Sequence, residues 1–163
     1  RRRHTRFKCD WSSDVCSSDL LSRAKIILIV IVGLFIILQL IPLNQTNPPV
    51  IQDASAPSDI KLILKTSCYD CHSNETEWPW YSRIAPGSFL ITRDVVEGRK
   101  HLNFSEFSDL DAFDSTDIAD EILEVLEEGE MPILPYLLLH PGASLSDSQI
   151  ETLTGWAETL YSE

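Results

Sequence analysis

The sequence predicts an all-α protein, in which a small domain of about four short helices follows a single transmembrane helix. Three observations lead to this prediction. Apolar residues recur at helical spacing in several segments after residue 58, no segment alternates as a strand does, and one uninterrupted apolar run lies near the N-terminus. The chain has 163 residues, which is too short for several domains.

Residues 1–21 are expected to be non-native. The stretch Asp10–Leu20 resembles translated sequencing-adapter DNA, and no initiator methionine precedes it, because the single methionine is Met131. Segments of this kind are excluded from fold reasoning. Cys9 and Cys16 are therefore assigned no chemistry, and a genuine basic tail is the alternative interpretation.

Residues 22–43 are predicted to form a transmembrane anchor. The run from Ala24 to Leu43 is apolar apart from Lys25 and Gln39, and about 20 residues are needed to cross a bilayer as a helix. Basic residues stand on its N-terminal side. The positive-inside rule therefore predicts a single-pass protein of the bacterial inner membrane with the following domain in the periplasm. A cleaved signal peptide, with a cleavage site at Ala54-Ser55-Ala56, is the alternative.

Residues 44–57 contain three prolines and no apolar periodicity, which predicts an extended linker between the anchor and the domain at 58–163. Apolar spacing predicts a short helix from Ser58 up to Cys68 and a second helix over 88–101. A third helix should start with Asp114 or Ser115 as its cap and end at Gly129. Ser146 opens a last helix in capping-box form.

The segment Cys68-Tyr69-Asp70-Cys71-His72 has the C-x-x-C-H form that is typical of c-type haem attachment. Two thiols one helical turn apart can each form a thioether with a haem vinyl group. His72 can then bind the iron as proximal ligand through a neutral imidazole. The motif predicts one covalent haem c, with Cys68 and Cys71 as attachment points and His72 on the iron.

Three other interpretations of the motif are weaker. A redox dithiol normally lies between a strand and a helix, whereas the flanks here predict a helix and a polar loop. A zinc site needs a fourth ligand and usually a second close pair, and no cysteine follows Cys71. A disulfide between Cys68 and Cys71 would be strained, because bridged Cα atoms normally lie farther apart.

Met131 is the expected second iron ligand. It follows the third predicted helix in the segment Gly129-Glu130-Met131-Pro132, and a thioether ligand raises the reduction potential of a haem. The alternative is that Met131 fills a gap in the core. His101 and His140 remain alternative ligands.

Other residues are candidates for haem contacts outside the iron. Guanidinium and ammonium groups can pair with the haem propionates, and the candidates are Arg93, Arg99 and Lys100. Aromatic side chains after the motif are expected to pack around the macrocycle edge, namely Trp78, Trp80 and Tyr81. Ordinary solvated or core positions are the alternative for both sets.

The predicted domain is strongly acidic. From Asp59 to Glu163 the chain carries 21 acidic and 6 basic side chains, for a net charge of −15. Such a domain repels nucleic acid and anionic surfaces, so no nucleic-acid partner is expected. The charge either marks a docking surface for a basic redox partner or belongs to solvated helix faces.

The region Lys65–Trp156 resembles the bacterial haem-binding-domain family of small cytochrome c-like proteins. The resemblance rests on an ordered set of short matches: Cys68-x-x-Cys71-His72-Ser73, Thr76, Pro79-Trp80-Tyr81, Ile84-Ala85-Pro86, Glu97-Gly98-Arg99, Leu102-Asn103-Phe104-Ser105, Met131-Pro132, Tyr136, His140-Pro141 and Leu145-Ser146. It implies covalent haem c on Cys68 and Cys71 with His72 as axial ligand. Two departures, Phe107 and Ile133-Leu134, affect the transfer of pocket shape but not the attachment chemistry.

These observations predict a membrane-anchored mono-haem cytochrome c that carries single electrons between extracytoplasmic redox partners and is not an enzyme. An iron held on both sides by protein ligands is closed to substrate, which suits electron transfer. A haem-based sensor or gas-binding module is one alternative. A peroxidase-like enzyme is another, and it requires an open iron with an acid–base residue such as His101 or His140.

Overall fold

The computed structural model describes residues 14–107 and 112–162. The chain divides into two compact units, with the boundary between Pro42 and Leu43. Within the described ranges every regular element is a helix, and strand-type pairing is limited to one isolated bridge between Gln52 and Glu106. The predicted all-α fold is confirmed.

The first unit is built on α1, which spans Asp14–Gln39. Its segment Ser22–Gln39 is long and apolar enough to cross a membrane, and none of it is buried within the protein. At 1.5 Å per residue, 18 residues extend about 27 Å, close to the thickness of a bilayer core. The expected non-native segment falls largely on residues 1–13, which lie outside the described residues, so that expectation is not tested.

The second unit contains the predicted helices and several short ones between them. In chain order they are α2 (Ser58–Ser67), α3 (Tyr69–His72), η1 (Trp80–Arg83), α4 (Gly87–His101), α5 (Ala112–Glu128), α6 (Leu134–Leu139), η3 (Pro141–Ala143), α7 (Asp147–Thr159) and η4 (Leu160–Ser162). The four longer helices, α2, α4, α5 and α7, are those that apolar periodicity predicts. The short elements escape prediction because fewer than two turns give no clear period.

Local signals at helix ends are mostly confirmed. Ser146 caps α7, and its capping box with Gln149 is complete. Gly129 follows α5 with φ of +68°, the left-handed conformation that ends a helix most easily at glycine. The start of α5 differs from the expectation, since the helix begins at Ala112 instead of after Asp114 or Ser115.

Residues 44–57, which we call the strap, are extended as predicted but do not form a free linker. The backbone of Ala54 donates to the carbonyl of Phe104 at 2.8 Å, and the amides of Ile51 and Gln52 both donate to the carbonyl of Ser105 at 3.1 Å. Ala54 is buried, with 2% of its surface exposed. The strap is part of the domain because these hydrogen bonds fasten it to the segment that follows α4.

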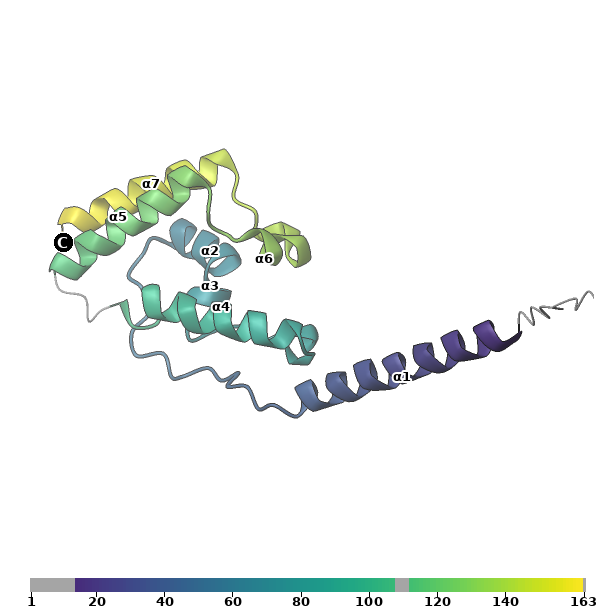
Figure 1. Ribbon diagram of the computed structural model, residues 1–163. Coiled ribbons are helices and arrows are strands. Elements are labelled where there is room, and N and C mark those ends of the chain that lie inside the picture. The colour runs from purple at the N-terminus through teal and green to yellow at the C-terminus, as the bar shows by residue number, and fades with distance from the viewer. Residues whose placement is uncertain (1–13, 108–111, 163) are drawn as a thin grey trace, which may run out of the picture. The chain divides into compact units, whose positions relative to one another are not determined.

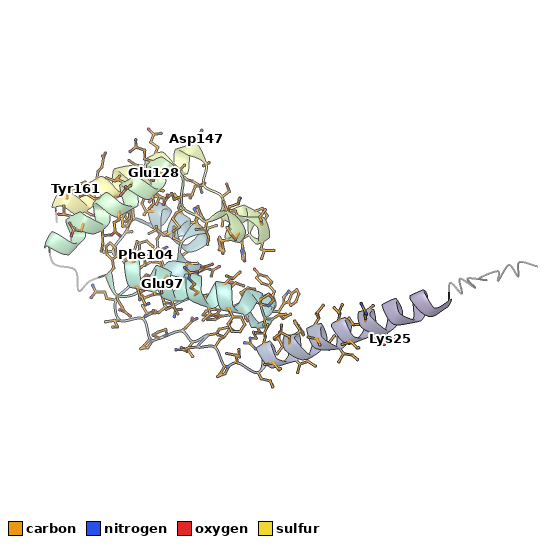
Figure 2. The ribbon with its side chains drawn as sticks, viewed as in Figure 1. Lys25, Glu97, Phe104, Glu128, Asp147 and Tyr161 are labelled. Atoms are coloured by element: carbon orange, nitrogen blue, oxygen red, sulfur yellow. The ribbon has the colours of Figure 1, made fainter. Side chains whose placement is uncertain are left out.

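The core of the domain lies between the antiparallel pair α5–α7 and helix α4, with α2 and α3 between them (Figure 1). Phe104 lies near its centre (Figure 2) and stacks on Tyr69 at 5.3 Å and on Phe107 at 5.9 Å between ring centroids. Phe107 in turn contacts Trp156 from α7 at 6.2 Å. This row of rings joins the start of α3 to α7, and two of its members, Phe104 and Trp156, line the cavity described below.

Candidate functional site

A cavity of about 460 Å³ lies in the domain between α3, α4, α5 and the segment that leads into α6. This volume is typical of pockets that enclose a small molecule or cofactor. Most of its lining is apolar, including Leu64, Leu102, Phe104, Ile118, Ile122, Val125, Leu126, Ile133, Leu153 and Trp156. The predicted attachment motif and Met131 also line it.

Cys68 and Cys71 both line the cavity and neither forms a disulfide. Cys68 ends α2, and Cys71 lies one turn later in α3. Burial raises the pKa of Cys68 to about 12 and that of Cys71 to about 11, so both are protonated thiols at neutral pH. A redox dithiol needs the opposite, a lowered pKa that supplies thiolate, and the raised pKa values therefore argue against thiol–disulfide exchange at this pair.

His72 presents one ring nitrogen to the cavity with the other held by the backbone. Its Nδ1 lies 3.1 Å from the carbonyl oxygen of Leu102. Because a carbonyl only accepts hydrogen bonds, Nδ1 must carry the proton, which leaves a lone pair on Nε2. Burial also lowers the pKa of His72, which favours the neutral imidazole that a metal ion requires.

The attachment motif is fixed against α4 by close backbone packing. A side chain at Gly98 would place its Cβ only 2.7 Å from the carbonyl oxygen of Cys71, so only glycine permits this approach. The backbone of Phe104 donates to the carbonyl of His72 at 2.8 Å. Gly98 within α4 and Phe104 after it thus both contact the C-terminal end of the short helix α3.

Two tyrosines hold the motif in place through hydrogen bonds to carboxylates. The hydroxyl of Tyr136 donates to Oδ2 of Asp70 at 2.8 Å, which ties α6 to α3. The hydroxyl of Tyr69 donates to Oδ1 of Asp53 at 2.6 Å, and Lys61 forms a salt bridge with the same carboxylate. Burial would raise the pKa of Asp53, but these two hydrogen bonds outweigh it and the pKa lies below its ordinary value.

Of the three candidates for the second iron ligand, Met131 and His101 line the cavity and His140 does not. Met131 lines the cavity in the segment between α5 and α6 and is 39% exposed. His101 also lines the cavity, at the end of α4. His140 does not: its Nε2 lies 3.0 Å from the hydroxyl of Tyr81 and its Nδ1 lies 3.1 Å from the carbonyl of Tyr136. Both of its nitrogens are engaged, so the structure does not support His140 as a ligand.

Arg99 differs from the expectation that it faces the haem propionates. Its guanidinium donates to the carbonyls of Ser73 and Thr46 and to the side chains of Asn47 and Thr76, at 2.7 to 2.9 Å. These contacts join the strap to residues that follow the attachment motif and use four of the five guanidinium N–H donors. Arg99 therefore has a positioning role, which the sequence does not reveal because two of its acceptors are backbone carbonyls.

The other predicted contacts are also absent from the described lining of the cavity. Trp80 is 76% exposed, and Trp78 donates its indole N–H to Asn47 of the strap. No lysine or arginine is found among the described residues that line the cavity. Five carboxylates line it instead: Asp70, Asp94, Glu97, Glu121 and Glu124, with Glu97 marked on α4 in Figure 2.

The residues present fit a haem held by thioethers. Two neutral thiols, an imidazole with a free Nε2 and a thioether sulfur line one mostly apolar cavity. Among the described residues no group of three or more His, Cys, Asp and Glu side chains could hold a metal ion directly. The zinc interpretation therefore lacks its ligand set, whereas an iron carried inside a macrocycle needs only the axial positions.

Comparison with known proteins supports haem binding. A model of the haem-binding domain family matches residues 33–159, well over half of the chain. The match includes the strap, the attachment motif, the methionine segment and all of α7. The comparisons with curated proteins and with solved structures give no match.

Proposed function

This chain belongs to the haem-binding domain family, and from that premise we propose that it is a membrane-anchored mono-haem c-type cytochrome that carries single electrons. Cys68 and Cys71 would hold the haem covalently, and His72 would bind the iron through Nε2. The observation that carries the proposal is the presence of these three side chains along one wall of the apolar cavity. Bound haem supplies a one-electron iron couple.

Met131 is the proposed distal ligand. It lines the same cavity, and the following Pro132 restricts the backbone of this segment. A thioether ligand would raise the reduction potential of a bound haem. With His72 and Met131 both holding the iron, the haem would supply electron transfer and not substrate binding.

A basic redox protein is the proposed partner. The carboxylates that line the cavity would give its mouth a negative potential, and complementary charge speeds encounter between redox proteins. We place the domain in the periplasm of a bacterial inner membrane, with α1 as the anchor. Two features support this topology. The candidate span Ser22–Gln39 is mostly apolar, and its two basic residues, Arg23 and Lys25, both lie at its N-terminal end.

The alternative is an open iron that binds gas or peroxide. His101 favours it, since this side chain lines the cavity and can act as an acid or base. The test is the reaction of the reduced full-length protein with carbon monoxide. We expect a low-spin iron that binds carbon monoxide slowly or not at all. Rapid binding to a high-spin iron would contradict the electron-transfer proposal and support a gas- or peroxide-binding function.

Protease accessibility in spheroplasts tests the topology. A domain in the periplasm is cleaved by added protease, whereas a protected domain would contradict the proposed orientation.

A further inference from the structure

One end of the domain differs from the rest of its acidic surface. It consists of η1 and the first half of α4, and we call it the η1–α4 face, with exposed residues Trp80, Arg83, Ile84, Leu90 and Arg93. Trp80 is 76% exposed, Leu90 60% and Ile84 41%. Residues 78–93 contain no Asp or Glu, in a domain whose net charge is −15. Neither arginine lies within salt-bridge distance of a described carboxylate.

The strap begins at this same face. The side-chain amide of Gln45 donates to the carbonyl of Ser82 in η1 and to the hydroxyl of Thr92 in α4. Only five residues separate Gln45 from Gln39, where α1 ends. A fully extended chain of this length spans roughly 20 Å. Whatever the arrangement of the two units, the η1–α4 face cannot move far from the end of the membrane helix.

We propose that the η1–α4 face rests on the surface of the lipid bilayer in which α1 is anchored. The inference depends on the proposed anchor but not on haem. Exposed tryptophan favours the interface between lipid tails and water, where its ring is apolar and its N–H is hydrated. Arg83 and Arg93 can pair with lipid phosphates, while the acidic remainder of the domain is repelled by anionic lipids.

Contact at this face orients the site. The cavity is lined by the second half of α4, at Asp94, Glu97 and His101, and not by the exposed residues of the η1–α4 face. Lipid contact therefore leaves the mouth of the cavity and its carboxylates available to a soluble partner. The short tether limits how far the domain can move from the bilayer surface.

A second apolar surface provides a matched control. Leu134, Leu138 and Leu139 on α6 are 70%, 74% and 61% exposed, so they are as apolar and as accessible as the η1–α4 face. Among the described residues, no hydrogen bond joins α6 to the strap. If exposure alone determined lipid contact, α6 would touch the bilayer as often as the η1–α4 face.

The test is photo-crosslinking of the full chain in nanodiscs of phosphatidylcholine and phosphatidylglycerol. The photoreactive residue p-benzoylphenylalanine replaces Trp80, Leu90, Leu138 or, as the insertion control, Phe35 in α1. Circular dichroism verifies that each variant folds, and mass spectrometry counts lipid adducts. We expect several-fold more lipid adducts at positions 80 and 90 than at position 138, and adducts at position 35.

Adducts at position 35 with none at 80 and 90, or with equal yields at 80, 90 and 138, overturn the proposal. Absence of adducts at position 35 would refute the anchor, and the inference would fail with it. None of these readouts depends on haem, so a failure here is distinguishable from a failure of the proposed cytochrome function.

Discussion

Replacement of Gly98 by alanine places a methyl group between α4 and the attachment motif. The new Cβ would lie 2.7 Å from the carbonyl oxygen of Cys71, 3.1 Å from its carbonyl carbon and 3.2 Å from its Cβ. Two of these three atoms belong to the backbone, so no side-chain rotation relieves the contact. Either α4 or α3 must move, and Cys71 and His72 move with α3.

The expected magnitude combines two opposing terms. Alanine stabilises a helix interior by about 0.5–1 kcal/mol relative to glycine, and overpacking of a close contact costs about 1–3 kcal/mol. Gly155 in α7 isolates the first term, because a Cβ at this position meets nothing within 4 Å. We therefore expect Gly98→Ala to be less stable than Gly155→Ala by about 1–3 kcal/mol, the steric cost alone.

The assay is equilibrium urea unfolding of both variants and the parent chain in detergent, followed by circular dichroism. Gly155→Ala should raise the free energy of unfolding and Gly98→Ala should not. The yield of covalently bound haem should also fall in Gly98→Ala alone, because the thiols and the imidazole are displaced. Equal stability and equal haem yield in the two variants would refute the close approach of α4 to the motif.

Three further predictions follow from the site. Met131→Ala should lower the reduction potential and allow the reduced iron to bind carbon monoxide quickly, whereas unchanged values in both measurements would exclude Met131 as ligand. Tyr136→Phe removes the donor to Asp70 and should lower the free energy of unfolding in urea by about 1 kcal/mol; Tyr161→Phe, which removes an exposed hydrogen bond, should have a smaller effect. The lowered pKa of Asp53 means that its charge stabilises the fold above its ordinary pKa of 3.8, and that this stabilisation is lost as pH falls through the lower folded value. Between about pH 5 and pH 3 the parent chain should therefore lose more stability than Asp53→Asn, and equal losses would contradict the assigned hydrogen bonds.

The sequence predicts the main helices because their apolar faces repeat with the period of the α-helix. The end signals of α5 and α7 are equally local: Gly129 supplies a left-handed residue, and Ser146 with Gln149 forms a capping box. The attachment motif is predictable for the same reason, since its three functional side chains lie within five residues. The family match supports haem binding on that basis.

The role of the strap and the position of α6 could not be predicted. The strap is held mainly by backbone and amide hydrogen bonds to distant residues, such as Ala54 to Phe104, and these leave no pattern in the sequence. The leucines of α6 suggest a core helix, yet Leu134 and Leu138 are exposed. Arg99 was expected at the propionates, but its acceptors come from the strap and the motif, which only the folded chain brings together.

The mass of the denatured protein tests the central claim most directly. The full chain is produced with a cytochrome maturation system, unfolded in acid and guanidinium, and weighed intact by mass spectrometry, beside the double variant Cys68→Ala, Cys71→Ala. We predict that the parent chain retains the mass and the colour of one haem after denaturation and that the double variant loses both. A parent chain that folds and yet carries no covalent haem would contradict the account.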